Sequence, residues 1–440
     1  RGRTGRRRAA LMELDVWRRL APLEEGALER WDAWARRGET PKDLERLARE
    51  ESPALSRFVS LQRELGPKAR AKFPDGRLTF ATSVGYEQST AAAVADHRAS
   101  VFRAAGGVAW DACAGVGGEA LALLLSGVPT VASDRSSDAL RCAAANAAFA
   151  RLRGEVSAPF AALRADALRA PIGGAHVLGL FDPDRRAPNG RRLPRPEDWS
   201  PPLDALLDAV DRSALAGACF KLAPSREAAD AALEWTRARP DRPAVLEWIS
   251  ARGRMRELAL WTGALAVGAT GPRRRATVLG PDTVTVDGPL DPFDDGESFD
   301  GALGDWRGRT LLDADVALWQ SELARERAEE ADLATVAPAV ARSFFVGPPA
   351  APAPPGFRAW DVLDAAPLDR RRVRAALKEH GVGPVTVKTR GGVPDANELA
   401  SKLRGPSGPP GLLAVTEVGD ARGKRQRVVL LLAERAPANE

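Results

Sequence analysis

The pattern of apolar and polar positions divides the chain into a helical beginning, an alternating middle and a short mixed end. Apolar residues recur at helical spacing through much of residues 10–72, which predicts helices there. A more polar helix is predicted over Ser89–Ala105, with Ser89 or Thr90 as its N-cap. We therefore expect residues 1–105 to form a helical N-terminal region.

Short apolar runs then alternate with helical patterns, which is typical of a parallel sheet with helices on both faces. The last two runs flank Gly253 and predict a hairpin that closes the sheet with an antiparallel edge. We expect a doubly wound, Rossmann-like α/β domain over residues 106–280, with seven strands. The predicted strands are residues 108–112, 129–133, 160–164, 176–181, 217–222, 244–250 and 257–262.

The last third of the chain changes character several times. Residues 281–305 are rich in Gly and Asp and are predicted to form an acidic insertion, and residues 306–347 return to a helical pattern, a helical connector. The segment PPAAPAPPG at 348–356 is predicted to be a stiff linker and a domain boundary. Residues 357–440 then predict a small α+β domain, with strands at 357–362, 384–388, 412–418 and 427–432 and helices at 369–379 and 397–403.

Composition limits the class of protein. A chain of 440 residues is too long for one ordinary core, so two or three domains are expected. No apolar run approaches the ~20 residues of a membrane span, so we predict a soluble protein without a membrane partner. Cys113, Cys142 and Cys219 lack metal-ligand spacing and the three histidines are far apart, so we predict no metal. A reducing cytoplasm is the simplest compartment.

Charge is distributed unevenly along the chain. Residues 367–440 hold fourteen Lys or Arg against eight Asp or Glu, whereas residues 281–305 hold eight acids and no base. A basic C-terminal region indicates a polyanionic partner such as nucleic acid. The alternative is that a GC-rich genome encodes many arginines, which lie on solvent-exposed faces without binding a partner. Residues 1–9 form a basic arm to which we assign no function.

The strongest chemical signal follows the first predicted strand. Asp111 ends this strand, and a turn with Cys113, Gly115, Gly117 and Gly118 leads into a helix. Because glycine has no Cβ, such a loop lets the backbone approach a nucleotide-like cofactor closely. The G-x-G-x-x-A spacing also fits a flavin or nicotinamide enzyme. The acid before the first glycine and the third glycine favour S-adenosylmethionine, whose ammonium Asp111 can bind.

Acids follow the next strands at similar positions. Asp134 ends the second strand, where a carboxylate can accept both ribose hydroxyls, and Asp166-Ala167 follows the third, where the pair can contact adenine. The fourth strand leads into Asp182-Pro183-Asp184-Arg185-Arg186. Each acid alone is most simply a helix cap or turn residue. Together, in order and at strand ends, they predict one cofactor site.

The segment after the fourth strand is predicted to carry the chemistry. Asp182 would accept a hydrogen bond from an attacking amine or hydroxyl, while Pro183 fixes the backbone. Arg185 and Arg186 would contact substrate phosphate. The alternative for these arginines is an ion pair with Asp184 or Glu197.

With these motifs, the sequence resembles a bacterial family of class I S-adenosylmethionine-dependent methyltransferases that carry a C-terminal THUMP-like domain. The resemblance covers about residues 60–440. Besides the glycine loop, it rests on Lys72-Phe73, Tyr86–Thr90, His97-Arg98, Asp182–Arg186, Gly190–Arg192, Trp199–Pro202, Lys221–Pro224, Glu247-Trp248, Arg274–Val278, Leu368–Arg372 and Val385–Lys388.

The resemblance implies methyl transfer to RNA, because THUMP domains are RNA-binding modules. Asp182 is followed by Pro-Asp-Arg and not by the Pro-Pro-aromatic of amino-directed nucleic-acid methyltransferases, so the target atom stays open. An oxidoreductase with FAD or NAD and a non-catalytic RNA-binding protein remain as alternatives. The residues predicted to contact substrate are Lys221, Arg370, Arg371, Arg372 and Lys388. The alternative for Lys221 is that it only completes a salt bridge.

Overall fold

The computed structural model describes residues 42–43, 46, 72–73, 81, 83–169, 172–187, 190–291, 299, 302–336, 344–389, 395–405, 408–419 and 425–434. The predicted helices of residues 10–72 and the basic arm lie almost entirely outside the described residues. Contacts divide the chain into two compact units, here called the N-terminal and C-terminal units. The first is Arg1–Val245 with Leu258–Pro272, and the second is Leu246–Glu257 with Arg273–Glu440.

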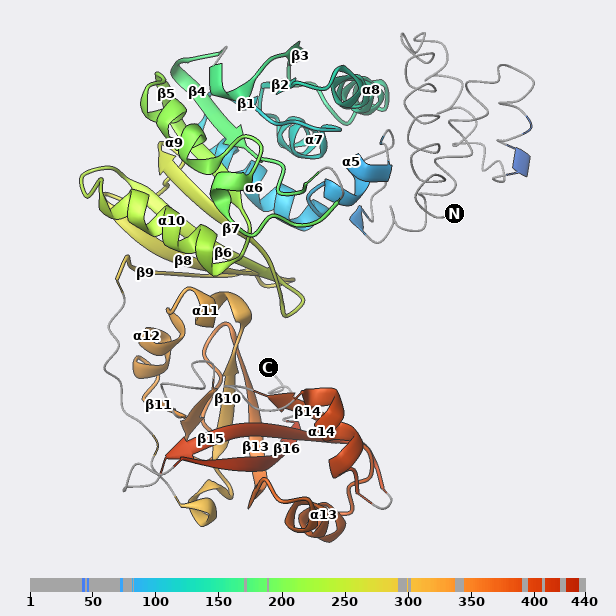
Figure 1. Ribbon diagram of the computed structural model, residues 1–440, viewed down its shortest axis with the longest axis vertical. Coiled ribbons are helices and arrows are strands. Elements are labelled where there is room, and N and C mark those ends of the chain that lie inside the picture. Colours follow the sequence, from blue (N-terminus) through green and yellow to red (C-terminus); the bar gives the residue numbers. More distant parts are fainter. Residues whose placement is uncertain are drawn as a thin grey trace. The chain divides into compact units, whose positions relative to one another are not determined.

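The first sheet has nine strands in the order β3-β2-β1-β4-β5-β7-β6-β8-β9 (Figure 1). Strands β1 to β5 pair in parallel, and β7 is antiparallel to β5. The strands are β1 Val108–Asp111, β2 Thr130–Asp134, β3 Phe160–Arg164, β4 Gly174–Phe181, β5 Leu215–Leu222, β6 Ala244–Ala251, β7 Arg254–Gly263, β8 Pro272–Leu279 and β9 Val284–Pro289.

The predicted doubly wound α/β fold is confirmed, and each of the seven predicted strands overlaps one of β1–β7. The turn between β6 and β7 has Arg252 and Gly253 at φ values of 55° and 67°, the left-handed conformation that tight hairpins use. Helices and short 3₁₀ turns connect the strands. They are α6 Ala92–Ala105, α7 Gly118–Leu125, α8 Ser137–Leu152, η1 Ala167–Arg169, η2 Pro196–Asp198, α9 Leu203–Asp211 and α10 Arg226–Arg237.

The helix before β1 begins later than predicted. A separate short helix, α5 (Ser83–Gln88), precedes α6, and Ala91 is the N-cap of α6, without a side-chain hydrogen bond. Neither predicted cap acts on α6. The Ser89 hydroxyl donates to the carbonyl of Gly85 at 2.6 Å, which closes α5 instead.

The predicted acidic insertion is partly a strand. Residues 284–289 form β9, which pairs antiparallel with β8. The Gly- and Asp-rich composition of residues 281–305 predicted an insertion and no strand, so β9 was missed. Asp287 accepts two hydrogen bonds from Arg275 across the strand pair, at 2.6 and 2.9 Å. Asp287 also lies 3.8 Å from Arg273 of β8, and the boundary predicted at residue 280 falls between the two strands.

A second sheet has seven strands in the order β11-β12-β10-β13-β16-β15-β14. Its C-terminal elements agree closely with the predicted α+β pattern of residues 357–440. The strands are β10 Thr310–Ala314, β11 Ala334–Thr335, β12 Phe344–Gly347, β13 Phe357–Pro367, β14 Val385–Thr389, β15 Gly411–Gly419 and β16 Arg425–Glu434. The helices are η3 Leu303–Trp306, α11 Val316–Gln320, α12 Ala324–Glu329, α13 Arg370–Glu379 and α14 Ala396–Leu403.

The predicted helical connector, residues 306–347, contributes strands to this sheet as well as α11 and α12. Strand β10 is buried along its whole length, with β12 on one side and β13 on the other. A strand with both faces buried has a continuous apolar run, which periodicity does not distinguish from a buried helix. The helical prediction was therefore wrong for β10 and β12.

The proline-rich segment 348–356 joins β12 to β13 within one sheet, so it does not separate two domains. The Thr310 hydroxyl in β10 donates to the carbonyl of Pro348 and accepts from the Ala351 amide, at 3.0 and 3.1 Å. These bonds hold the segment against the sheet.

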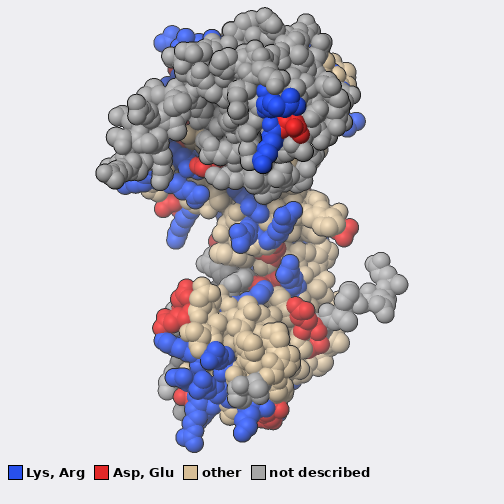
Figure 2. Space-filling model, turned by 90° about the vertical axis from the view of Figure 1, so that its right-hand side faces the viewer, with Lys and Arg blue, Asp and Glu red and all other residues tan. Residues whose placement is uncertain are grey.

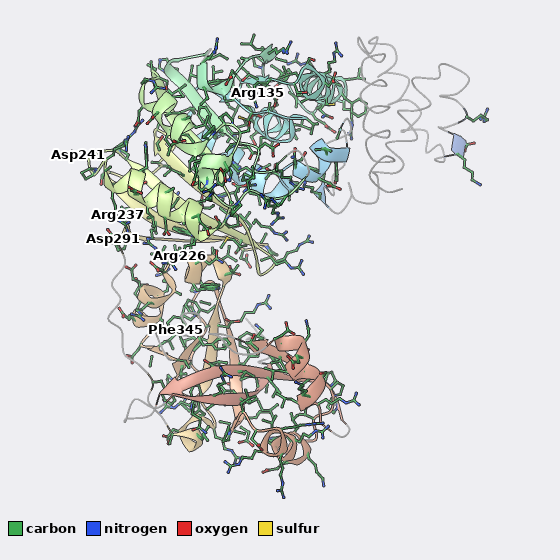
Figure 3. The ribbon with its side chains drawn as sticks, viewed as in Figure 1. Arg135, Arg226, Arg237, Asp241, Asp291 and Phe345 are labelled. Atoms are coloured by element: carbon green, nitrogen blue, oxygen red, sulfur yellow. The ribbon has the colours of Figure 1, made fainter. Side chains whose placement is uncertain are left out.

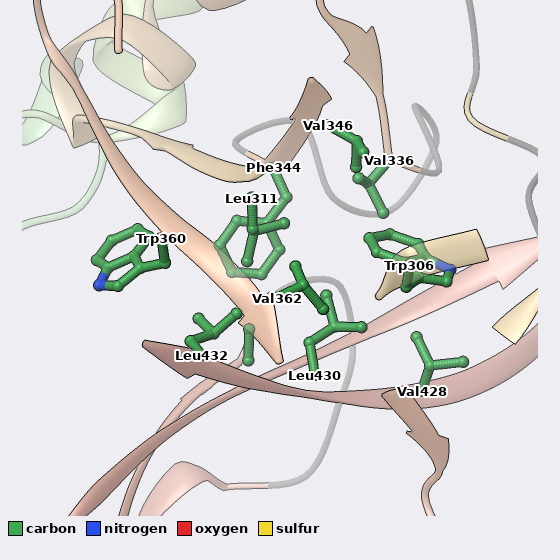
Figure 4. Close-up of a cluster of buried hydrophobic side chains, with 11 residues drawn as sticks. Trp306, Leu311, Val336, Phe344, Val346, Trp360, Val362, Val428, Leu430 and Leu432 are labelled. Atoms are coloured by element: carbon green, nitrogen blue, oxygen red, sulfur yellow. The ribbon is translucent and has the colours of Figure 1, made fainter. Parts of the chain in front are cut away.

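One apolar cluster spans both sides of this segment (Figure 4). Trp306, Leu311 and Phe344 precede it in the chain, whereas Trp360 and Leu430 follow it. All five side chains are buried. Because the cluster needs residues from both sides, the predicted linker lies inside a single folded unit.

Replacing Phe344 by Ala should destabilise the C-terminal unit by about 3–5 kcal/mol, the usual cost of removing a buried aromatic ring. The matched control is Leu363→Ala in β13, whose side chain is exposed and whose loss should change stability by less than about 0.5 kcal/mol. Urea unfolding followed by tryptophan fluorescence compares the two variants. Equal stabilities would show that the cluster does not hold the unit together.

Candidate functional site

A cavity of about 640 Å³ lies where strands β1, β2 and β4 end in the N-terminal unit, and α5 forms part of its wall. Parallel strands end at one edge of a sheet, so the loops that follow them converge there. Most of the residues predicted for the cofactor and the chemistry line this cavity. They are Cys113, Gly115, Gly118, Asp134, Asp166, Ala167, Asp182, Pro183, Arg185 and Arg186.

The glycine loop is shaped by left-handed backbone. Gly117 has a φ of 84°, and a Cβ there would lie 2.8 Å from the Cα of Ala143, so a side chain does not fit. Gly115 has a φ of 53° and no atom near the place of a Cβ, which leaves backbone facing open space. Gly118 opens helix α7 and also lines the cavity. The loop therefore exposes backbone at the edge of the cavity.

Asp134 and Asp166 are both anchored by backbone amides. The two carboxylate oxygens of Asp134 accept from the amides of Gly115 and Ser136, at 3.0 and 2.8 Å. Asp166 accepts from the amide of Leu168 at 3.0 Å. Each carboxylate oxygen has two lone pairs, so these anchored groups still have capacity to accept hydrogen bonds from a ligand.

Asp182 is held by an ion pair. The ammonium of Lys221, which lies in β5, is 2.5 Å from a carboxylate oxygen of Asp182. Lys221 is only 5% exposed and does not line the cavity, so the structure places it behind Asp182 and not in the predicted contact with substrate. A cation at this distance holds the Asp182 carboxylate in one orientation.

Asp111 lies deeper than the loop that follows it. Its side chain is buried, and its Oδ2 atom has no hydrogen-bond partner among the described residues. Burial, together with Glu119, Asp182 and Asp134, raises the pKa of Asp111 well above the ordinary value. An unpartnered buried carboxylate oxygen is rare and indicates a missing donor. Burial also raises the pKa of the Cys113 thiol, which argues against a reactive thiolate.

Several cavity residues were missed by the sequence analysis. Glu119 in α7 lines the cavity and pairs with the buried Arg98 of α6 at 3.2 Å. Thr90 lines it too, and its buried hydroxyl has no partner among the residues that the model describes. Glu119 lies on a helix, where nothing in the sequence marks it as facing the cavity, whereas Thr90 lies between α5 and α6, at the end of the Tyr86–Thr90 stretch that carries the resemblance.

Lys72 anchors the short helix α5. Its ammonium donates to the carbonyls of Tyr86 and Glu87, at 2.8 and 3.0 Å. Burial and the nearby Lys221 lower the pKa of Lys72 to about 8. The Lys72 ammonium therefore holds the backbone of α5 beside the cavity.

Arg185 and Arg186 do not form the predicted alternative ion pairs. Glu197 pairs with Arg195, and Asp184 accepts from the backbone amide of Arg186 instead of its guanidinium. Two further arginines line the cavity, Arg135 and Arg192. Arg135 follows β2 (Figure 3), and its guanidinium donates to the Ser200 hydroxyl at 2.8 Å.

The remaining predicted residues lie in the C-terminal unit. Arg370, Arg371 and Arg372 are exposed in the first turn of α13, whose N-cap is Asp369. Lys388 is bound within its own unit, since its ammonium is 2.9 Å from Asp313. It also lies 4.2 Å from the centre of the Trp360 ring. Lys388 is therefore less available to a substrate than predicted.

Membrane-spanning helices and metal sites are both absent from the residues that the structure describes. In that part of the chain, no helix is long and apolar enough to cross a membrane. Likewise, no group of three or more His, Cys, Asp or Glu side chains there is arranged to hold a metal ion.

Comparisons with known proteins agree with this geometry. A family model described as THUMP domain-like matches residues 357–434. S-adenosylmethionine-dependent methyltransferases of Mycobacterium tuberculosis strains CDC 1551 and H37Rv, both uncharacterised, are each 32% identical over 338 residues, covering 77% of this chain and 84% of theirs. A crystal structure from Porphyromonas gingivalis W83, described as a candidate methyltransferase, has a TM-score of 0.67 at 18% identity, covering 94% of this chain and 99% of that one.

The identity and coverage of the mycobacterial relatives decide between the cofactors that the glycine loop left open. S-adenosylmethionine is the cofactor, and the alternative of an oxidoreductase with FAD or NAD is set aside. This chain belongs to the S-adenosylmethionine-dependent methyltransferases and carries a THUMP-like domain at its C-terminal end.

Proposed function

We propose that this methyltransferase modifies RNA, either tRNA or rRNA. The observation that carries the proposal is the combination in one chain of a methyltransferase cavity with a THUMP-like domain at residues 357–434. The resemblance described above implies that such a domain binds RNA.

The cavity residues fit the cofactor. Gly115 and Gly117 have left-handed backbone that a side chain would strain, and Gly118 lines the cavity next to them. Asp134 would accept the ribose hydroxyls, and Asp166 with Ala167 would contact the adenine. The unpartnered Oδ2 of Asp111 would accept from the ammonium of the amino acid end, directly or through a water.

The chemistry requires little beyond alignment and a proton acceptor. When bound, S-adenosylmethionine supplies an electrophilic methyl group. Asp182 would accept a hydrogen bond from the attacking amine or hydroxyl, while Lys221 fixes the carboxylate from behind at 2.5 Å. Pro183, buried next to it, limits movement of the backbone.

The C-terminal unit offers a surface for RNA. Figure 2 shows Lys and Arg side chains gathered at the lower end of this unit, where α13 lies in Figure 1. Arg370, Arg371 and Arg372 are exposed in the first turn of α13. The helix dipole disfavours cations in a first turn, so these arginines do not stabilise the helix. Binding to phosphates accounts for them better.

The substrate class is tested by mass spectrometry of nucleosides from tRNA and rRNA of a strain that lacks the gene, compared with its parent. Loss of one methylated nucleoside, restored by the wild-type gene and not by an Asp182→Asn variant, is the expected result. Identical nucleoside profiles would contradict an RNA substrate while leaving the methyltransferase family unchanged.

Asp134→Ala should weaken binding of S-adenosylhomocysteine by about 2 kcal/mol, roughly thirtyfold in Kd, because charge-assisted hydrogen bonds are lost. Asp138→Ala is the matched control, since Asp138 lines the same cavity but pairs with Arg141. Its affinity should stay within a few-fold of wild type. Calorimetry measures both. Unchanged affinity in Asp134→Ala would remove this residue from the cofactor site.

Asp182→Asn should lower methyl transfer about 100-fold while cofactor affinity stays nearly constant, as expected for a group that acts on the nucleophile. Asparagine keeps an oxygen acceptor for Lys221, so folding should be preserved. Transfer of labelled methyl groups to RNA from the deletion strain gives the rate, and calorimetry gives the affinity. A parallel fall in both would make Asp182 a structural residue.

A further inference from the structure

A hairpin after β4 carries a group of arginines beside the cavity. Its described arms are residues 184–187 and 190–200, here called the arginine hairpin. The amides of Asp184 and Ser200 each donate to the carbonyl of the other, at 2.9 Å. Farther along, the Leu193 amide donates to the carbonyl of Arg185 at 2.8 Å. The backbone of the hairpin is therefore fixed by its own hydrogen bonds.

A buried tryptophan stiffens the second arm of the hairpin. Trp199 is 2% exposed, and its indole N–H donates to the carbonyl of Leu193 at 3.0 Å. Arg186 and Arg192 lie opposite each other as an antiparallel bridge on the two arms. The arginines thus extend from a rigid support, which lowers the entropy that binding a ligand would cost.

Three of these arginines face the cavity without an ion pair. Arg185, Arg186 and Arg192 all line it, and none has a carboxylate partner within 4.0 Å among the residues that the model describes. Arg195 differs, because Glu197 and Asp198 pair with it at 3.7 and 3.0 Å. Among the described residues, the hairpin therefore carries one arginine that is paired with carboxylates and three that have no such partner.

The carboxylates of the cavity are largely engaged elsewhere. Glu119 pairs with Arg98, Asp138 with Arg141, and Asp182 with Lys221. Asp134 and Asp166 accept backbone amides and are assigned to the cofactor. Glu87 and Asp184 also line the cavity, and Asp184 accepts from the Arg186 amide and from Gln88. No carboxylate lies within 4.0 Å of the Arg185, Arg186 or Arg192 guanidinium groups among the described residues, so an anionic ligand could pair with them directly.

We propose that Arg185, Arg186 and Arg192 of the arginine hairpin bind an RNA phosphodiester next to the nucleotide that enters the cavity. The inference rests on the proposed function and adds a binding surface in the N-terminal unit to the one on α13. Guanidinium groups suit this role because they bind phosphate oxygens with two parallel hydrogen bonds. Three such groups on two arms hold one backbone segment in a fixed position relative to Asp182.

The test compares two triple variants with equal changes in charge. In the first, Arg185, Arg186 and Arg192 become Gln. In the control, Arg153, Arg195 and Arg226 become Gln; these arginines do not line the cavity, and all three pair with carboxylates. Filter binding to bulk tRNA and to a mixed-sequence single-stranded RNA is measured over a range of salt concentrations. Calorimetry with S-adenosylhomocysteine follows the cofactor site separately.

The hairpin variant should bind both RNAs roughly tenfold more weakly, with a salt-dependence slope about 2 smaller, because each phosphate contact on a single strand contributes about 0.7. The control variant should bind like wild type, and both should keep cofactor affinity. Equal RNA binding by the two variants would overturn the proposal, as would a parallel loss of cofactor affinity in the hairpin variant.

These outcomes are separable from a failure of the proposed function. RNA binding that depends on the hairpin, in a protein whose deletion changes no nucleoside, would keep the binding site and remove RNA as the methyl acceptor. Methylation of RNA, together with equal RNA binding by both variants, would keep RNA as the methyl acceptor and remove the arginine hairpin as a binding site.

Discussion

The site depends on one constraint, the parallel pairing of β1 with β2 and β4. Asp111 pairs in register with Ala132 on one side and Leu180 on the other, so the three strands end at the same edge. The loops that follow them must converge there, because parallel strands share a direction. A shift in the register of one strand by one residue would move the side chains of that strand to the opposite face of the sheet.

Charge pairing makes the cavity possible. Burying a carboxylate without a partner is costly, so most acids near the cavity have a cation or a backbone amide beside them. Lys221 faces Asp182, and Arg98 faces Glu119. Asp111 is the exception, with a raised pKa and an unpartnered oxygen. Burying the Asp111 carboxyl without a partner destabilises the folded protein, and a cationic group of a bound cofactor would offset this cost.

The C-terminal unit shows how distant segments complete one sheet. Strand β10 is paired on both sides, with β12 and with β13, and the proline-rich segment lies between those two neighbours in the sequence. Its prolines suit a connection that crosses from one strand to another, since they cannot continue the ladder. The THUMP-like match begins at residue 357, whereas the sheet that contains it begins at β10. The family model therefore covers only part of the folded unit.

Sequence alone determined the strand ends of the doubly wound sheet and the order of Asp111, Asp134, Asp166 and Asp182, because strand alternation and glycine-rich turns are local signals. It did not place β8, β9, β10 and β12 correctly. Strands β10 and β12 share a sheet with β13, β16 and β15, which follow much later in the chain, whereas β8 and β9 pair with each other and were missed all the same. Sequence alone also did not assign Glu119 and Thr90 to the cavity, and it did not separate Arg195 from the arginines that line the cavity. Which charge meets which is decided only when the folded chain brings them within hydrogen-bonding distance.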